Sequence, residues 1–186
     1  MGSIQPVTLL LPSQQSVTIR TATPDDAQAV LTYTQDVMDE APYLLTTREE
    51  FTKTVEDQHQ FLASYMEHPH QLALLAELDG HVVGFLNFQN GHRKRIAHQG
   101  EMSMSLLHEV RGQSLGRAMV EQLIQWAQGN PLLEKVTLDV FSDNQPAVAL
   151  YERVGFIKEG IQRKAIKMED GTYHSLIRMA LFLDKE

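Results

Sequence analysis

The sequence of 186 residues contains no cysteine, and this absence excludes several kinds of chemistry. Without thiols the chain has no disulfide, no thiolate metal site and no cysteine nucleophile. A chain without disulfides suits a reducing compartment, so we expect a cytoplasmic protein. The eight histidines are scattered without the spacing of metal ligands, and we therefore expect no metal site.

Long apolar runs and an excess of positive charge are also lacking. No run approaches the ~20 residues that span a bilayer, and the first fifteen residues lack the basic start of a signal peptide. The formal net charge of −8 argues against a nucleic-acid-binding surface. The one dense basic run, HRKR at residues 92–95, is interpreted as a solvated hairpin turn. We expect neither membrane nor nucleic acid as a partner.

Hydrophobic residues make up 42% of the chain, enough to fill the core of one domain. Residues 1–16 are interpreted as an N-terminal extension or an added edge segment, and residues 17–186 as the folded domain. Period-two alternation predicts strands, and helical spacing of apolar residues predicts helices. Strands are expected at residues 17–22, 71–78, 81–89, 101–107, 135–141, 156–168 and 172–183. Helices are expected at residues 23–40, about 52–66, after residue 111, and within 144–156. This order implies an α/β fold with one mixed sheet of about seven strands.

The stretch VRGQSLGRAMV, residues 110–120, places two glycines, two arginines and a serine before an apolar helical run. It lacks the Gly-Lys pair of a P-loop and the spacing of a dinucleotide fingerprint. Free backbone N–H groups at a helix start can bind a phosphate or pyrophosphate, and Arg111 and Arg117 can add contacts. The alternative is an ordinary turn between a strand and a helix.

A second cluster, DNQPAVALYERVGF, follows the strand predicted at 135–141. Asn144 and Tyr151 are seven residues apart, so two helical turns place them on one face. An amide and a phenol on one side of a helix indicate the wall of a site. The alternative is a helix cap (Asn144) and a core aromatic (Tyr151).

Together the two clusters resemble the GNAT superfamily of acetyl-CoA-dependent N-acetyltransferases, in its small bacterial form. The family's pyrophosphate motif, Q/R-x-x-G-x-G/A, appears here as RGQSLG at residues 111–116. Its later motif, N-x-x-A-x-x-L-Y-x-x-x-G-F, is matched at Asn144, Ala147, Leu150, Tyr151, Gly155 and Phe156. The resemblance covers roughly residues 17–183. It departs at Ser114, which replaces the middle glycine. Serine keeps its N–H and is a good helix N-cap, so we expect cofactor binding to survive.

The resemblance implies a mostly antiparallel, twisted sheet with helices on both faces and two splayed strands that bind acetyl-CoA. It also implies direct transfer of the acetyl group to a primary amine in a ternary complex. Leu106 and Leu107 would pair with the pantetheine, and Asn144 would bond its arm. Tyr151 would protonate the leaving thiolate as the catalytic acid. A homodimer is compatible with the family. The full set of implied cofactor-binding residues is Leu106, Leu107, Arg111, Gly112, Gln113, Ser114, Leu115, Gly116, Arg117, Asn144 and Tyr151.

The attacking amine must be neutral, so a base or a water relay has to remove its proton. Glu101, on the strand that leads to the implied site, is the first candidate for a catalytic base, and His98 is the second. A solvent-facing Glu101 and a mechanism without a dedicated base are the alternatives.

Negative charge near the implied acceptor side would favour a cationic amine, such as a polyamine, an amino-acid derivative or a protein N-terminus. The acidic residues concerned are Asp36, Asp39, Glu40, Glu49 and Glu50. The alternative is that they lie on solvated helix faces. The competing function is a non-catalytic acyl-CoA-binding or sensor module with the same fold. Ser114 favours that function, whereas the intact Asn144 and Tyr151 oppose it.

Overall fold

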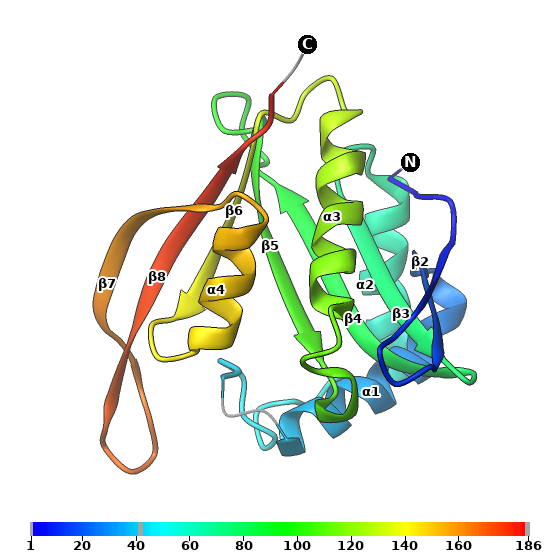
Figure 1. The fold of residues 1–186 in the computed structure, drawn as a ribbon, viewed down its shortest axis with the longest axis horizontal. Helices are drawn as coiled ribbons and strands as arrows, with labels where there is room; N and C mark the ends of the chain where they lie inside the picture. Colours follow the sequence, from blue (N-terminus) through cyan, green and yellow to red (C-terminus); the bar gives the residue numbers. More distant parts are fainter. Residues whose placement is uncertain (1, 41–42, 185–186) are drawn as a thin grey trace.

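An open, twisted sheet forms the centre of the structure, in the order β1-β2-β3-β4-β5-β6-β8-β7 (Figure 1). The computed structural model describes residues 2–40 and 43–184. The first residue of the expected extension (1–16) and the last two residues of the expected domain (17–186) therefore lie outside the described residues. Neighbouring strands are antiparallel except β5 and β6, which are parallel. The predicted mixed, mostly antiparallel sheet is confirmed. The strands are Val7–Leu10 (β1), Ser16–Thr21 (β2), Leu72–Leu78 (β3), His81–Asn90 (β4), Gln99–Leu106 (β5), Lys135–Phe141 (β6), Ile157–Lys167 (β7) and Tyr173–Phe182 (β8).

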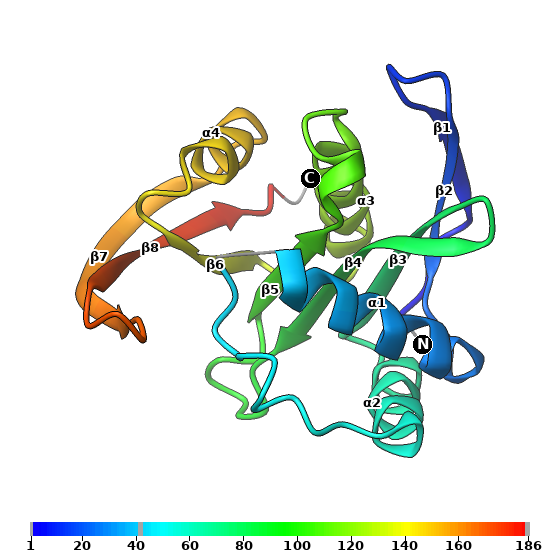
Figure 2. The same ribbon diagram turned by 90° about the horizontal axis from the view of Figure 1, so that it is seen from below.

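Two helices cover each face of the sheet, as Figure 2 shows from below. We call the face that carries α1 (Ala27–Glu40) and α2 (Val55–Glu67) the front face, although it is the far side of the sheet in Figure 1. The face that carries α3 (Leu115–Gln128) and α4 (Gln145–Arg153) is the back face. The larger core lies at the back, where α3 and α4 pack against the sheet, and a smaller one lies under α1 and α2. Helices on both faces are thus confirmed. No helix within the described ranges is both long and apolar enough to cross a bilayer.

The N-terminal segment forms the edge strand β1, which is the eighth strand beside the seven expected. β1 pairs with β2 from Val7, opposite Ile19, to Leu10, opposite Ser16. Leu11 is fully buried in the back core, and the N–H of Ile4 donates to Thr21 Oγ1 at 3.0 Å. The segment is therefore fixed to the sheet by pairing and by burial.

Short-range hydrogen bonds set the start of both front helices. Thr54 accepts from the N–H of Asp57, whose carboxylate accepts from the N–H of Thr54, so α2 begins at Val55 rather than near residue 52. The start of α1 follows a 3-10 turn, Pro24–Asp26, where Asp26 accepts from the N–H and hydroxyl of Thr23 at 2.8 and 3.0 Å. Both carboxylates also suit the positive end of a helix.

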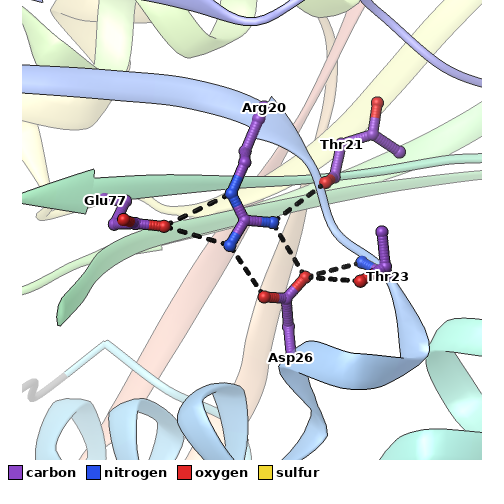
Figure 3. A network of polar contacts seen from close by, with 5 residues as sticks. All are labelled: Arg20, Thr21, Thr23, Asp26 and Glu77. Atoms are coloured by element: carbon purple, nitrogen blue, oxygen red, sulfur yellow. Dashed lines mark hydrogen bonds and ion pairs between the residues drawn. The ribbon is translucent and has the colours of Figure 1, made fainter. Parts of the chain in front are cut away.

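Asp26 belongs to a polar network that ties α1 to the sheet (Figure 3). Arg20 of β2 donates to both oxygens of Asp26, at 2.9 and 2.7 Å, and to Glu77 of β3 at 3.0 and 3.3 Å. Burial by itself would raise the pKa of Asp26, but hydrogen bonds from Arg20 and Thr23, with the charge of Arg20, hold that pKa below its usual value. The network therefore stabilises the fold while Asp26 is ionised.

The turn that precedes α3 contains two residues with left-handed backbone angles. Gly112 has φ of 71° and Ser114 has φ of 66°. Ser114 stands at the N-cap position, but its hydroxyl makes no capping hydrogen bond. Its place at the N-cap agrees with the sequence, but the side-chain bond that usually accompanies a serine cap is absent, because that bond normally needs extended backbone angles. Ser114 instead adopts the conformation that glycine adopts most easily.

Replacing Asp26 with asparagine should lower the free energy of unfolding by about 1–3 kcal/mol, since a charge-assisted hydrogen bond is lost. Because the folded-state pKa of Asp26 lies below the ~3.9 of an unfolded chain, its contribution is complete above about pH 4 and disappears as the pH falls through the folded-state value. Urea unfolding from pH 7 to 3 should show a smaller acid loss in Asp26→Asn than in the wild type. Asp25→Asn, an exposed neighbour at the same helix start, is the control, and equal effects of the two changes would contradict the role of the network.

Replacing Ser114 with glycine should raise the free energy of unfolding by about 1 kcal/mol, because a left-handed backbone is costly for residues with a Cβ. The melting temperature should rise by about 2–4 °C for a chain of this size. Gly112→Ala, at a position where an added Cβ meets nothing within 4 Å, should lower the melting temperature by a similar amount. A stabilising Gly112→Ala or a destabilising Ser114→Gly would argue against backbone strain.

Candidate functional site

β5 and β6 lie side by side at one end and diverge at the other (Figure 1). Their parallel pairing covers only Gln99 to Glu101 on β5, opposite Lys135 to Thr137 on β6. Beyond it, β5 stays paired with β4, and β6 stays paired with β8 along its whole length. The two strands therefore form a splay, whose apex is the pair Glu101 and Thr137.

The backbone of β5 presents unpaired peptide groups to this splay. The N–H of Leu107 donates to the carbonyl oxygen of Val83 on β4 at 2.9 Å. Because peptide groups alternate in direction along a strand, those of Leu106 and Met104 point away from β4, toward the splay. The N–H of Leu106 is thus well placed for the predicted backbone contact, whereas its carbonyl oxygen accepts from Arg111 and the N–H of Leu107 is already used. Met104 was missed, because its direction depends on the strand register.

A row of free N–H groups lies behind the splay, at the start of α3. The backbone N–H groups of residues 112–117 donate no hydrogen bond to another described residue, and the first helical bond runs from Ala118 to Ser114 at 3.1 Å. The left-handed angles of Gly112 and Ser114 curl the backbone so that successive N–H groups form a concave surface. Together with the helix dipole, this arrangement is an anion site.

The longer side chains of this loop are already engaged with the protein. Arg111 donates through Nε and Nη2 to the carbonyl oxygen of Leu106, at 2.9 and 2.8 Å. Arg117 pairs with Glu121 one turn along α3 at 2.7 Å. Gln113 joins the loop to the β1–β2 turn by accepting from the N–H of Ser13 at 3.2 Å. An anion at this site therefore meets backbone N–H groups first.

Gly116 and Leu115 fix the position of the loop against the sheet. Leu115 is fully buried in the back core. A Cβ on Gly116 would lie 3.1 Å from Leu150 Cδ1 of α4 and 3.2 Å from Leu106 Cδ1 of β5. The glycine thus allows α3 to come close to both β5 and α4, and it brings the anion site to the open end of the splay.

Tyr151 is buried on α4, with 7% of its surface exposed, in the core cluster that also holds Met102 of β5 and Val140 of β6. Its ring packs against Phe156 with centroids 5.8 Å apart. Its hydroxyl makes no hydrogen bond to another described residue. Burial raises the pKa of Tyr151 to about 12, so the phenol stays protonated at neutral pH.

Asn144 caps α4, which is the alternative to a binding role that the sequence left open for this residue. Its Oδ1 accepts from the N–H of Ala147 at 3.4 Å. Its amide nitrogen donates to no described residue and can still meet a ligand. The cap and a binding role are therefore compatible.

A polar pocket of about 660 Å³ opens on the front face beside the apex of the splay, over β4, β5, β6 and β8. Glu101 lies in it, but its carboxylate accepts from Arg178 Nη1 at 2.9 Å. Arg178 also donates to Asp139 at 2.7 Å. Arg178 and Asp139 were missed, because they face one another only through the register of β6 and β8. His98 stands before the paired residues of β5, at the closed end of the splay.

The acidic residues near α1 serve local contacts for the most part. Glu40 accepts from the N–H of His108 at 2.8 Å and lies 3.9 Å from Arg111. Asp39 lies 3.7 Å from Arg48, and Glu50 accepts from the N–H of Thr47 at 2.9 Å. These three carboxylates bind protein groups, which leaves Asp36 and Glu49 of the set. In the described ranges, no three His, Asp or Glu side chains gather in a way that could hold a metal ion.

Comparisons with known proteins agree with this geometry. Residues 36–156 match the model of the acetyltransferase (GNAT) family. The L-amino acid N-acetyltransferase AaaT of Escherichia coli is 26% identical over 122 residues, which are 66% of this chain and 75% of that protein. The N-alpha-acetyltransferase RimI of Mycobacterium tuberculosis is 26% identical over 110 residues, which are 59% of this chain and 67% of that protein.

Two solved structures share the fold. A GNAT-family acetyltransferase from Streptococcus pneumoniae superposes with a TM-score of 0.86 at 28% identity, covering 90% of this chain and 99% of that one. The structure of yncA from Salmonella typhimurium, solved with its cofactor acetyl-CoA, has a TM-score of 0.79 at 19% identity, covering 91% and 95%. With a family match over more than half of its length, the chain belongs to the GNAT acetyltransferase family.

Proposed function

We propose that this protein transfers the acetyl group of acetyl-CoA to a primary amine by direct attack in a ternary complex. One observation carries the proposal: a row of six free N–H groups opens at the end of a splay whose strand edges are unpaired. The relatives' names support amine acetylation, since one is an L-amino acid N-acetyltransferase and one an N-alpha-acetyltransferase.

The residues of the splay fit acetyl-CoA as the cosubstrate. The N–H groups of residues 112–117 would hold its pyrophosphate, and the N–H of Leu106 on β5 would pair with its pantetheine arm. The amide of Asn144 would add a bond from the side of α4. Bound there, acetyl-CoA supplies an acyl thioester whose carbonyl would be polarised by another N–H that β5 directs into the splay.

Tyr151 is proposed as the proton donor to the leaving thiolate. Its hydroxyl has no competing acceptor among the described residues, and its high pKa keeps it protonated. A phenol can protonate a thiolate of lower pKa only when the two are close and dry, and the burial of Tyr151 meets the second condition. Solvent returns the proton to the phenol after release of the product.

The front-face pocket is the proposed acceptor side, because it opens at the apex of the splay. Glu101 is the proposed base for the amine, acting directly or through water. The competing sensor function loses support, since Ser114 adopts the left-handed angles of a glycine and its N–H donates to no described residue. A thiol-release assay over a panel of amines separates the two functions, because a sensor releases no thiol.

A negative charge at Ser114 should oppose the pyrophosphate. Acetyl-CoA should raise the melting temperature of the wild type, because a ligand that binds only the folded state stabilises it by ~2.7 kcal/mol at a hundredfold excess over Kd. Ser114→Asp should remove most of this shift, whereas Ser114→Asn, of nearly equal shape, should keep it. Both residues tolerate the left-handed backbone. No shift in the wild type at millimolar acetyl-CoA would contradict the cosubstrate, and equal shifts in both variants would contradict an anion site at residues 112–117.

Removing the Tyr151 hydroxyl should slow chemistry without weakening the fold. Tyr151→Phe should lower kcat by ~10²-fold, the low end for general acid catalysis. Acetyl-CoA affinity and the melting temperature should change little, because the hydroxyl makes no hydrogen bond to any residue that the structure describes. The measurement is single-turnover acetyl transfer at saturating substrates. A loss below about threefold would mean that water protonates the thiolate instead.

A further inference from the structure

The guanidinium of Arg178 lies over the apex of the splay on the front face. Arg178 belongs to β8, and its side chain crosses β6 to reach β5. Its Nη2 donates to Asp139 at 2.7 Å, and its Nη1 donates to Glu101 at 2.9 Å and to Thr137 Oγ1 at 3.4 Å. Since Glu101 and Thr137 are the last paired residues of the two strands, the guanidinium stands where an acyl group in the splay would meet its acceptor.

The two carboxylates on Arg178 are held differently. The Asp139 side chain is 20% exposed, and it fixes the guanidinium from the side of β6. The Glu101 side chain is 56% exposed and holds Arg178 through a single oxygen. Ion pairs this exposed contribute little to stability, so Glu101 can leave Arg178 at small cost. Asp139 therefore anchors the guanidinium of Arg178, whereas another carboxylate can replace that of Glu101 as its hydrogen-bond acceptor.

Arg178 also has unused donors. Its Nε makes no hydrogen bond to another described residue, and Nη2 has one N–H beyond the one that Asp139 accepts. A guanidinium offers these N–H groups in a planar fork that matches a carboxylate. The site can thus take a carboxylate from a ligand in place of that of Glu101, with no change in net charge.

Resting on the acetyl transfer proposed above, we propose that the acceptor is a free α-amino acid whose carboxylate binds Arg178 and displaces Glu101. One carbon separates the two groups of an α-amino acid, so a carboxylate on Arg178 sets the amine at the apex of the splay. The displaced Glu101 is then the nearest free carboxylate and takes a proton from the ammonium group. The amine nitrogen forms its bond to the acetyl carbon as the carbon–sulfur bond breaks, and the thiolate takes the proton of Tyr151. The nitrogen, now part of the amide, releases its second proton to water, and solvent later reprotonates Tyr151.

The surrounding pocket suits such a ligand. Its volume of about 660 Å³ is within the usual range for small-molecule sites. Gln89, Asn90 and Ser103 line it with amides and a hydroxyl rather than with a wide apolar wall. The other cation of the pocket, Lys135, is held by Glu159 at 2.6 Å, and its ammonium makes no hydrogen bond or ion pair to Glu101 or Thr137. Arg178 is therefore the cation of this pocket that is available to bind the carboxylate of the acceptor.

The test compares free amino acids with their α-carboxamides as acceptors. Pairs with small, apolar, acidic and basic side chains are assayed by thiol release from acetyl-CoA. For the best pair, kcat/KM of the acid should exceed that of the amide by about ten- to hundredfold, the usual worth of a hydrogen bond to a charged group. Arg178→Met should bring this ratio close to one. Lys135→Met, which removes the same charge from the same pocket, should keep the ratio.

A binding measurement tests the exchange at Glu101 without turnover. With CoA present, Glu101→Gln should bind the best amino acid about threefold or more tightly than the wild type does, because a neutral amide competes less for the guanidinium. Binding of the matched carboxamide should not change. A merely structural Glu101–Arg178 pair would leave both affinities unaltered, and that result would overturn the exchange.

The outcomes separate the two proposals. The carboxamide also resembles a peptide N-terminus, so equal or better turnover of the amide would overturn the amino-acid acceptor and leave the acetyltransferase proposal standing. A ratio that survives Arg178→Met would overturn the role of Arg178. Absence of thiol release with both members of every pair would overturn this inference alone. Absence of release with the wider panel of amines as well, in a protein that binds acetyl-CoA, would overturn the proposed function and this inference with it.

Discussion

The separation of β5 and β6 after three residue pairs is the constraint on which the rest of the structure depends. Each strand keeps its outer neighbour, so the sheet remains continuous while its centre opens. Buried peptide groups without partners are costly, and this opening must therefore hold water or a ligand. The close approach of α3 to α4 at Gly116 supports the opened strands from behind. A ligand that supplies a strand-like edge offsets a cost that the fold already carries.

The chain has a net charge of −8, yet its proposed cosubstrate is a polyanion. Groups that lie within a few ångströms of the proposed anion site explain how a negatively charged protein can bind this polyanion. The two arginines of the loop serve the protein: Arg111 closes the end of β5 and Arg117 pairs with Glu121. Backbone N–H groups at the start of α3 are left to meet the anion. Such dipoles are fixed by the helix and act over a few ångströms, so the overall negative field has little influence on the bound state.

Signals confined to a few neighbouring residues made most of the fold predictable. Alternation located the strands, and the pairing of Thr54 with Asp57 is readable as a capping box, although the start of α2 moved by three residues. The position of the glycine-containing loop before α3 was also predictable from its own sequence. The absence of a side-chain capping bond at Ser114 was not, because the backbone angle of one residue depends on how the turn meets the sheet.

Most of the front side of the candidate site could not be predicted from the sequence. Glu101 was found, since it alternates on a recognisable strand. Arg178 is 77 residues away from it, and the two meet only because β8 lies next to β6 with Asp139 opposite Arg178. Strand order and register are properties of the whole sheet, and no local spacing encodes them. The same holds for Met104, whose peptide direction follows from its pairing with β4.

The two edges of the sheet bear on how the protein behaves at high concentration. An open edge is a template on which a strand of another molecule can add, the first step toward aggregation. β1 limits this risk by its length of four residues. β7 is long and almost wholly exposed, but it carries Lys158, Arg163, Lys164 and Lys167, and its pairing with β8 is irregular near residue 164. Like charges on two such edges repel, so the outer edge of β7 can stay open without pairing to a second molecule.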